Sequence, residues 1–148
     1  MGQRPAPTRR REARKRALDL LYQADLRGQP IAVVLAEHMA PDAPEPLSEF
    51  TVALVRGVNR TIDQIDALIS RHAREWKLSR MPLVDRNLMR MALYEVLHDP
   101  DVPTAVAIDE AVELAKQLST EDSGRFINGV LSAIANSEPV PEAPAPTA

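Results

Sequence analysis

The chain has 148 residues, of which 45% are hydrophobic, and its formal net charge at pH 7 is −3. The absence of cysteine excludes disulfides and thiolate metal sites and suits a reducing compartment. No apolar run approaches the ~20 residues that span a bilayer, and no apolar stretch follows the N-terminal charges as it would in a secretory signal. These features predict a cytoplasmic protein with a substantial core.

Helical periodicity extends through the chain between two ends that are rich in proline and alanine. We predict disordered tails at residues 1–8 and 137–148 and one domain at residues 9–136. No segment shows the alternation of a half-buried strand. The expected fold class is therefore all-α, a bundle of about six or seven helices with short connections.

Local start and stop signals divide this domain into helices. Gly28 is expected to end a first helix at about residues 9–26, and Pro30 precedes a short helix, IAVVLAEHM. Further helices are expected at about residues 48–72, from a first turn that contains Pro82 to about residue 98, at residues 104–118, and from an N-cap at Asp122 or Ser123.

Apolar side chains recur at helical spacing in these segments and predict the core. The helix that contains Pro82 is apolar around most of its circumference, so we expect it to be the central one. The other expected core residues are Ala13, Ala17, Leu20, Leu21, Ala24, Phe50, Leu54, Val58, Ile62, Ile65, Ile69, Ala107, Ala111, Leu114, Leu118, Ile127, Val130, Leu131 and Ile134.

Basic side chains are concentrated at residues 9–16, although the whole chain is slightly acidic. A stripe nearly opposite the core face of the first helix contains Arg11, Lys15, Leu18 and Tyr22, and Arg14 lies between the two faces. Cations neutralise phosphates and a tyrosine can stack on an unpaired base, which favours RNA binding. The alternatives are a solvated helix start and a Tyr22 ring that packs on a neighbouring helix.

Phe126 lies about 100° from the apolar stripe of the last helix. An uncovered ring there loses burial worth ~2 kcal/mol, so either a neighbouring helix or a ligand is expected to cover it. Asp122, one turn earlier, either caps the helix or accepts hydrogen bonds from base edges. The residues alone leave both alternatives open.

No motif for catalysis or cofactor binding is recognisable. The five glycines are dispersed and form no phosphate-binding loop, and the spacing of polar residues supports no nucleophile triad or carboxylate pair. His38, His72 and His98 are scattered and are expected at surface or packing positions. We therefore expect a non-enzymatic protein without a metal or cofactor.

Three stretches carry a family resemblance: an arginine-rich helix, RREARKRALDLLYQAD; a central helix, VDRNLMRMALYEVL; and a long C-terminal segment, DVPTAVAIDEAVELAKQLSTEDSGRFINGVL. Together they resemble the NusB family of transcription antitermination factors, with a likeness that extends from Arg9 to Ile134. Residues 27–75 match only in their helical pattern. The resemblance implies two antiparallel three-helix subdomains that share a long central element.

The resemblance also implies a function and partners. It implies binding to single-stranded boxA RNA of ribosomal RNA leaders, together with the ribosomal protein NusE, within the antitermination complex on RNA polymerase. The implied RNA contacts, with Lys15 added from the basic stripe, are Arg10, Arg11, Arg14, Lys15, Tyr22, Lys116, Asp122 and Phe126. The implied protein-partner surface lies near Tyr22 and Asp85.

Two positions depart from many relatives. Glu12 interrupts the arginine run and is expected to lower the affinity for RNA. Asp85 is shorter than the glutamate of some relatives, which makes a salt bridge to the protein partner less expected. Some members of the family form homodimers. The alternative functions are a helical RNA-binding module like that of ribosomal RNA cytosine methyltransferases, a helix-turn-helix reader of duplex DNA, and a purely structural homodimer.

Overall fold

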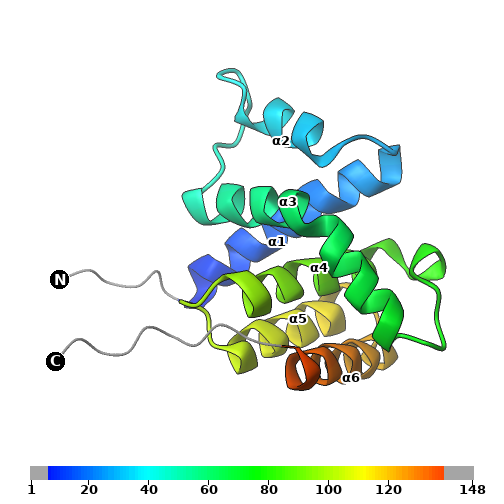
Figure 1. Ribbon diagram of the computed structural model, residues 1–148. Helices are drawn as coiled ribbons and strands as arrows, with labels where there is room; N and C mark the ends of the chain where they lie inside the picture. The colour runs from blue at the N-terminus through cyan, green and yellow to red at the C-terminus, as the bar shows by residue number, and fades with distance from the viewer. Residues whose placement is uncertain (1–6, 139–148) are drawn as a thin grey trace, which may run out of the picture. The chain divides into compact units, whose positions relative to one another are not determined.

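The computed structural model describes residues 7–138, and every regular element in this range is helical (Figure 1). The elements are α1 (Pro7–Arg27), α2 (Ile31–Met39), α3 (Glu49–His72), the short 3₁₀ helix η1 (Leu78–Arg80), α4 (Leu83–His98), α5 (Thr104–Leu118) and α6 (Glu121–Ser137). The all-α prediction is confirmed. The expected tails lie largely outside the described residues, although α1 already begins at Pro7 and α6 ends at Ser137.

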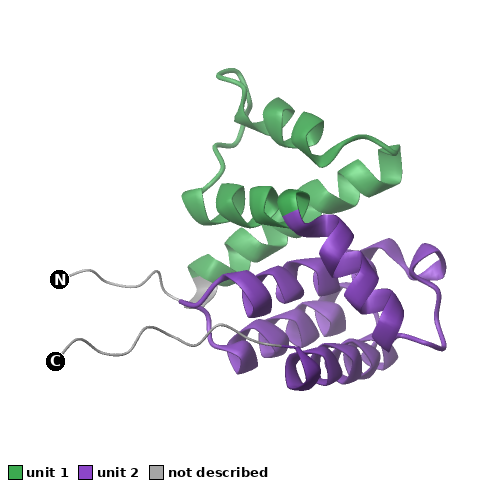
Figure 2. Ribbon diagram, viewed as in Figure 1, with its two compact units in different colours: residues 1–60 green, residues 61–148 purple. Residues whose placement is uncertain are grey.

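The chain divides into two compact units, residues 1–60 and 61–148 (Figure 2). Unit 1 contains α1, α2 and the N-terminal half of α3. Unit 2 contains the C-terminal half of α3 together with η1, α4, α5 and α6. No helix within residues 7–138 combines the length and the apolar character that crossing a membrane requires.

Gly28 ends α1 as predicted, because its φ of 64° is a conformation that glycine adopts without a steric penalty. The Gln29 amide then donates a 2.9 Å hydrogen bond back to the carbonyl of Ala24. At the start of α3, the Ser48 hydroxyl accepts a 3.1 Å hydrogen bond from the Thr51 amide. At these two helix ends, a glycine and a polar side chain thus satisfy some of the backbone groups that helix ends leave unpaired.

Two predicted helix starts are wrong by one to three residues. Thr120 is the N-cap of α6, because its hydroxyl accepts a 3.0 Å hydrogen bond from the Ser123 amide. Asp122 and Ser123 therefore lie inside the first turn. Pro82 has an extended ψ of 140° and precedes α4 instead of lying in its first turn.

The core matches the periodicity with few exceptions. In unit 1 the small and branched residues of α1, including Ala17, Leu20 and Leu21, are buried. In unit 2 the central α4 buries ten residues from Asp85 to Val96, as its all-round apolar character predicts. The exception in α5 is Leu118, its last residue, which is 47% exposed, while Ile108 and Ala115 are buried. Phe50 and Ile62 are half-buried.

A forked ion pair ties α4 to the C-terminal half of α3 within unit 2. Arg90 donates from Nε to Asp66 Oδ1 at 2.8 Å and from Nη2 to Oδ2 at 2.9 Å. A third donor, Nη1, reaches Asn87 Oδ1 at 3.0 Å. Arg90 is 8% exposed, so this pair replaces much of the hydration of its guanidinium with fixed hydrogen bonds.

Candidate nucleic-acid interface

The basic segment of α1 presents its cations unequally to solvent. Arg9 is exposed, Arg10 and Arg11 are half-buried, and the side chain of Lys15 is 37% exposed. Tyr22, two turns beyond Lys15, is half-buried, so part of its ring or hydroxyl remains accessible. Leu18, which lies on the same stripe, is only 4% exposed. The stripe is therefore a partly covered strip of surface and not a fully solvated helix face.

The Phe50 ring contacts two of these arginines. The guanidinium carbons of Arg10 and Arg14 each lie 5.2 Å from the centre of its ring, within the range of a cation–π interaction. Arg14 is 3% exposed, and Arg10 Nε is buried without a hydrogen-bond partner among the described residues. The structure thus places Arg14 in the packing of α1 on α3, which argues against a direct RNA contact through its charge.

Carboxylates accompany Lys15 and Arg16 of α1. Glu12 Oε1 lies 3.7 Å from Lys15 Nζ, and both side chains are partly exposed. Arg16 contacts Asp19 at 3.2 Å and Glu45 at 3.8 Å. Exposed pairs of this kind are weak and compete poorly with a multivalent anion. Glu12 therefore reduces the field at Lys15 without removing the lysine from the surface.

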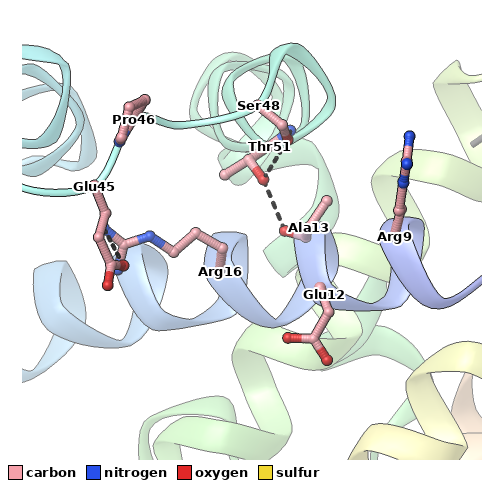
Figure 3. Close-up of a pocket in the computed structure, with 8 residues that line it drawn as sticks. All are labelled: Arg9, Glu12, Ala13, Arg16, Glu45, Pro46, Ser48 and Thr51. Carbon is pink, nitrogen blue, oxygen red and sulfur yellow. Dashed lines mark hydrogen bonds and ion pairs between the residues drawn. The ribbon is translucent and has the colours of Figure 1, made fainter.

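A shallow cavity of about 460 Å³ lies between α1 and the loop that leads into α3 (Figure 3). Thr51 and Ala13 line this cavity, and the Thr51 hydroxyl donates a 2.9 Å hydrogen bond to the carbonyl of Ala13. Figure 3 shows Arg16 extending toward Glu45 across one end. The lining residues are Arg9, Glu12, Ala13, Arg16, Glu45, Pro46, Ser48 and Thr51. Because acidic and basic groups balance here, the cavity has no clear preference for an anion.

In unit 2 the expected site residues cluster around the turn between α5 and α6. Lys116 is about half exposed and lies 3.7 Å from Glu113. Asp122 has a side chain that is 93% exposed, and Arg125 Nη1 approaches its Oδ1 at 3.8 Å. Because Thr120 caps α6, the carboxylate of Asp122 has no capping role and remains at the surface.

Phe126 is half-buried and its ring meets that of Trp76. The ring centres are 5.2 Å apart and the ring planes cross at 86°, an edge-to-face arrangement. The sequence analysis missed Trp76, which lies in the segment between α3 and η1 and is 39% exposed. Its signal was the only tryptophan of the chain in a stretch of basic residues, AREWKLSR.

Asp85 occupies a different environment from the one expected. It is fully buried, and its Oδ2 accepts a 2.8 Å hydrogen bond from the Ser123 hydroxyl. A salt bridge with a partner protein needs an accessible carboxylate, so the burial of Asp85 argues against a direct partner contact at this residue. Asp85 instead joins the first turns of α4 and α6.

The histidines pack against neighbouring groups. Nδ1 of His38 lies 2.9 Å from the Val34 carbonyl, and Nε2 of His72 lies 3.0 Å from the Ser137 hydroxyl. His98 Nε2 contacts Gln64 Oε1 at 2.9 Å. Within residues 7–138, no group of three histidine, aspartate or glutamate residues is placed to hold a metal ion.

The fold and surface define an all-helical protein with partly exposed cationic and aromatic side chains on α1 and around the turn between α5 and α6. The sequence model of the NusB family matches residues 11–136, and the chain therefore belongs to this family. Transcription antitermination protein NusB of Saccharopolyspora erythraea is 56% identical over 128 residues, covering 85% of this chain and 86% of the relative. The protein of the same name from Salinispora tropica is 54% identical over 129 residues, covering 85% and 94%.

Solved structures show the same fold. T. maritima NusB superposes with a TM-score of 0.75 at 34% identity, covering 97% of this chain and 96% of that one. A chain in the crystal structure of antitermination factors NusB and NusE in complex with dsRNA gives a TM-score of 0.74 at 29% identity, covering 87% and 97%.

Proposed function

We propose that the chain is a non-enzymatic transcription antitermination factor that binds single-stranded boxA RNA of ribosomal RNA leaders together with the ribosomal protein NusE. The relatives named for antitermination support the general role. The complex of one structural relative with NusE and dsRNA supports the two classes of partner. The observation that carries the proposal is the partly exposed row of cations on α1.

The proposed RNA contacts fall into two groups, one in each unit. In unit 1 they are Arg10, Arg11, Lys15 and Tyr22, with Arg14 supporting Arg10 through their shared contact with Phe50. In unit 2 they are Lys116, Asp122 and Phe126. The four cations contact phosphates, and the tyrosine, phenylalanine and aspartate contact bases by stacking or hydrogen bonding.

A salt titration tests this proposal. A labelled boxA-like single-stranded RNA is titrated with the full chain at several concentrations of KCl, and binding is followed by fluorescence anisotropy. Neutralising about four phosphates predicts a slope of log K against log salt of about −3, at roughly 0.7 per contact. A flat dependence contradicts the proposed role of the basic row.

The alternatives predict different preferences. A duplex DNA reader would be displaced from RNA by competing duplex DNA, whereas the proposed factor would not. The chain covers 86–94% of the length of the two antitermination relatives described above, which favours the antitermination role over the methyltransferase alternative.

The partner surface is proposed around Tyr22. Affinity-tagged chain incubated with lysate is expected to retain both NusE and leader RNA and to enter the RNA polymerase antitermination complex. Sedimentation at several concentrations then tests whether the free chain forms a homodimer. Retention of neither NusE nor leader RNA contradicts the proposal.

A further inference from the structure

Trp76 and Phe126 form a perpendicular pair of rings at the surface of unit 2. The ring centres are 5.2 Å apart with an interplanar angle of 86°, and Trp76 remains 39% exposed. Two rings at a right angle form a corner with one flat face and one edge. A planar ligand can stack on the face and contact the second ring at its rim.

Both rings are attached to ordered backbone. In the turn between α3 and η1, the Trp76 amide donates a 3.2 Å hydrogen bond to the carbonyl of Ala73. Phe126 lies one turn after Ser123, whose hydroxyl is bonded to the buried Asp85 at 2.8 Å. A platform fixed before binding loses little side-chain entropy when a ligand stacks on it.

Cations lie close to both rings along the chain. Arg74 and Lys77 are exposed and lie within two residues of Trp76. Arg125 is exposed next to Phe126, and its contacts with Asp122 at 3.8 Å and Glu121 at 4.0 Å are long. Such exposed pairs contribute little, so a phosphate can replace them.

We propose that Trp76 and Phe126 together form the stacking site for one unpaired RNA base, with Trp76 as a base-contacting residue and Arg74, Lys77 and Arg125 near the flanking phosphates. This inference rests on the proposed RNA-binding function and adds Trp76 to it. Aromatic rings with adjacent cations suit single-stranded nucleic acid, because every base has a flat face and every linkage carries a charge. A paired base inside a duplex offers no free face.

The single tryptophan makes the site directly observable. The intrinsic fluorescence of the full chain is recorded during titration with a single-stranded oligoribonucleotide of about 12 nucleotides. This length lies within the usual site sizes of domains that bind single-stranded nucleic acid. Stacking predicts quenching of the Trp76 emission that saturates with binding. The same strand annealed into a duplex, and inorganic polyphosphate of similar charge, are expected to bind without this quenching.

Substitutions separate stacking from packing. Trp76→Leu keeps an apolar side chain but removes the stacking face, and it is expected to weaken single-strand binding about 5- to 150-fold, the range for one lost base–aromatic stack. Trp76→Phe is expected to retain most of the affinity. Val106→Ala, at a similarly exposed apolar residue of unit 2 (43%), is the matched control and should leave affinity unchanged.

The outcomes distinguish this site from the broader function. Salt-dependent RNA binding without Trp76 quenching, or with unchanged affinity in Trp76→Leu, overturns the stacking site and leaves the proposed function intact. Equal quenching by the duplex also overturns it. The absence of any RNA binding overturns both. If the Trp76→Leu variant unfolds, the quenching measurement on the unaltered chain alone decides whether the stacking site exists.

Discussion

The Asp85 carboxylate and the Ser123 hydroxyl form a fully buried 2.8 Å hydrogen bond between the first turns of α4 and α6. Ser123 Oγ also accepts a 3.0 Å hydrogen bond from Thr120 Oγ1 and lies 3.0 Å from Ser119 Oγ. Asp85 Oδ1 has no partner among the described residues. This hydrogen bond joins the first turn of α6, which follows the turn between α5 and α6, to α4 across 38 residues of sequence.

We expect Ser123→Ala to lower the free energy of unfolding by about 1–3 kcal/mol, because it removes the hydrogen bond from the Ser123 hydroxyl to the buried Asp85 carboxylate. Urea denaturation measures the loss. Ser70→Ala, at an exposed position in α3, is the control and should change stability by less than about 0.5 kcal/mol. Equal stability of the two variants would show that the buried carboxylate is satisfied in another way.

The forked pair between Arg90 and Asp66 predicts a large difference between two arginines of unit 2. Arg90→Met leaves Asp66 without its bidentate partner in a partly buried position and is expected to lower stability by about 3 kcal/mol. Arg125→Met removes only long contacts between exposed groups and should change stability by less than about 1 kcal/mol. Thermal unfolding at low and high salt measures both, and the effect of Arg90→Met should persist in high salt because the pair is screened little.

One substitution is expected to have opposite effects at two glycines. Gly28 has a φ of 64°, so Gly28→Ala should destabilise the chain by about 1 kcal/mol. Gly129 lies within α6, and apart from the neighbouring residues and backbone of its own helix no heavy atom lies within 4 Å of an added Cβ, so Gly129→Ala should stabilise the chain by about 0.5–1 kcal/mol. Urea midpoints that shift in the same direction would contradict this assignment.

Arg14 and Lys15 are neighbours with different expected roles. Arg14→Gln should lower stability by about 2 kcal/mol through the lost contact with Phe50 and leave the salt dependence of RNA binding unchanged. Lys15→Gln should leave stability nearly unchanged and reduce the magnitude of the salt slope by about 0.7. Denaturation and RNA titration of both variants test the distinction, and a reversed pattern would return Arg14 to the RNA contacts.

Helix positions and most of the core could be predicted from the sequence because burial repeats with the helical period. Features that depend on contacts between distant segments could not. Thr120, Asp122 and Ser123 are all competent N-caps, and the hydrogen bond of Ser123 to Asp85 commits its hydroxyl elsewhere. The exposure of Leu118 follows from its position at the very end of α5, where the periodicity no longer specifies a neighbour.

The candidate site was predicted only in part for the same reason. Charge and spacing placed cations on α1 and located Phe126 beside the core stripe. They did not reveal that Phe50 binds Arg14 or that Trp76 faces Phe126, because each contact joins residues more than 30 positions apart. Counting charges cannot separate an arginine that packs on a ring from one that faces solvent.

The position of Phe50 divides the basic residues of α1 into two kinds. Arg10 and Arg14 contact its ring, whereas Arg9 is exposed to solvent. The flat, weakly hydrated guanidinium suits an aromatic face better than the compact lysine ammonium. Exchange of arginine for lysine should therefore be poorly tolerated at Arg10 and Arg14, which lie four residues apart against the ring, and readily tolerated at the exposed Arg9. Tolerance to this charge-conserving exchange should therefore distinguish the positions of α1 that contact Phe50 from the exposed ones, although both look equally basic in the sequence.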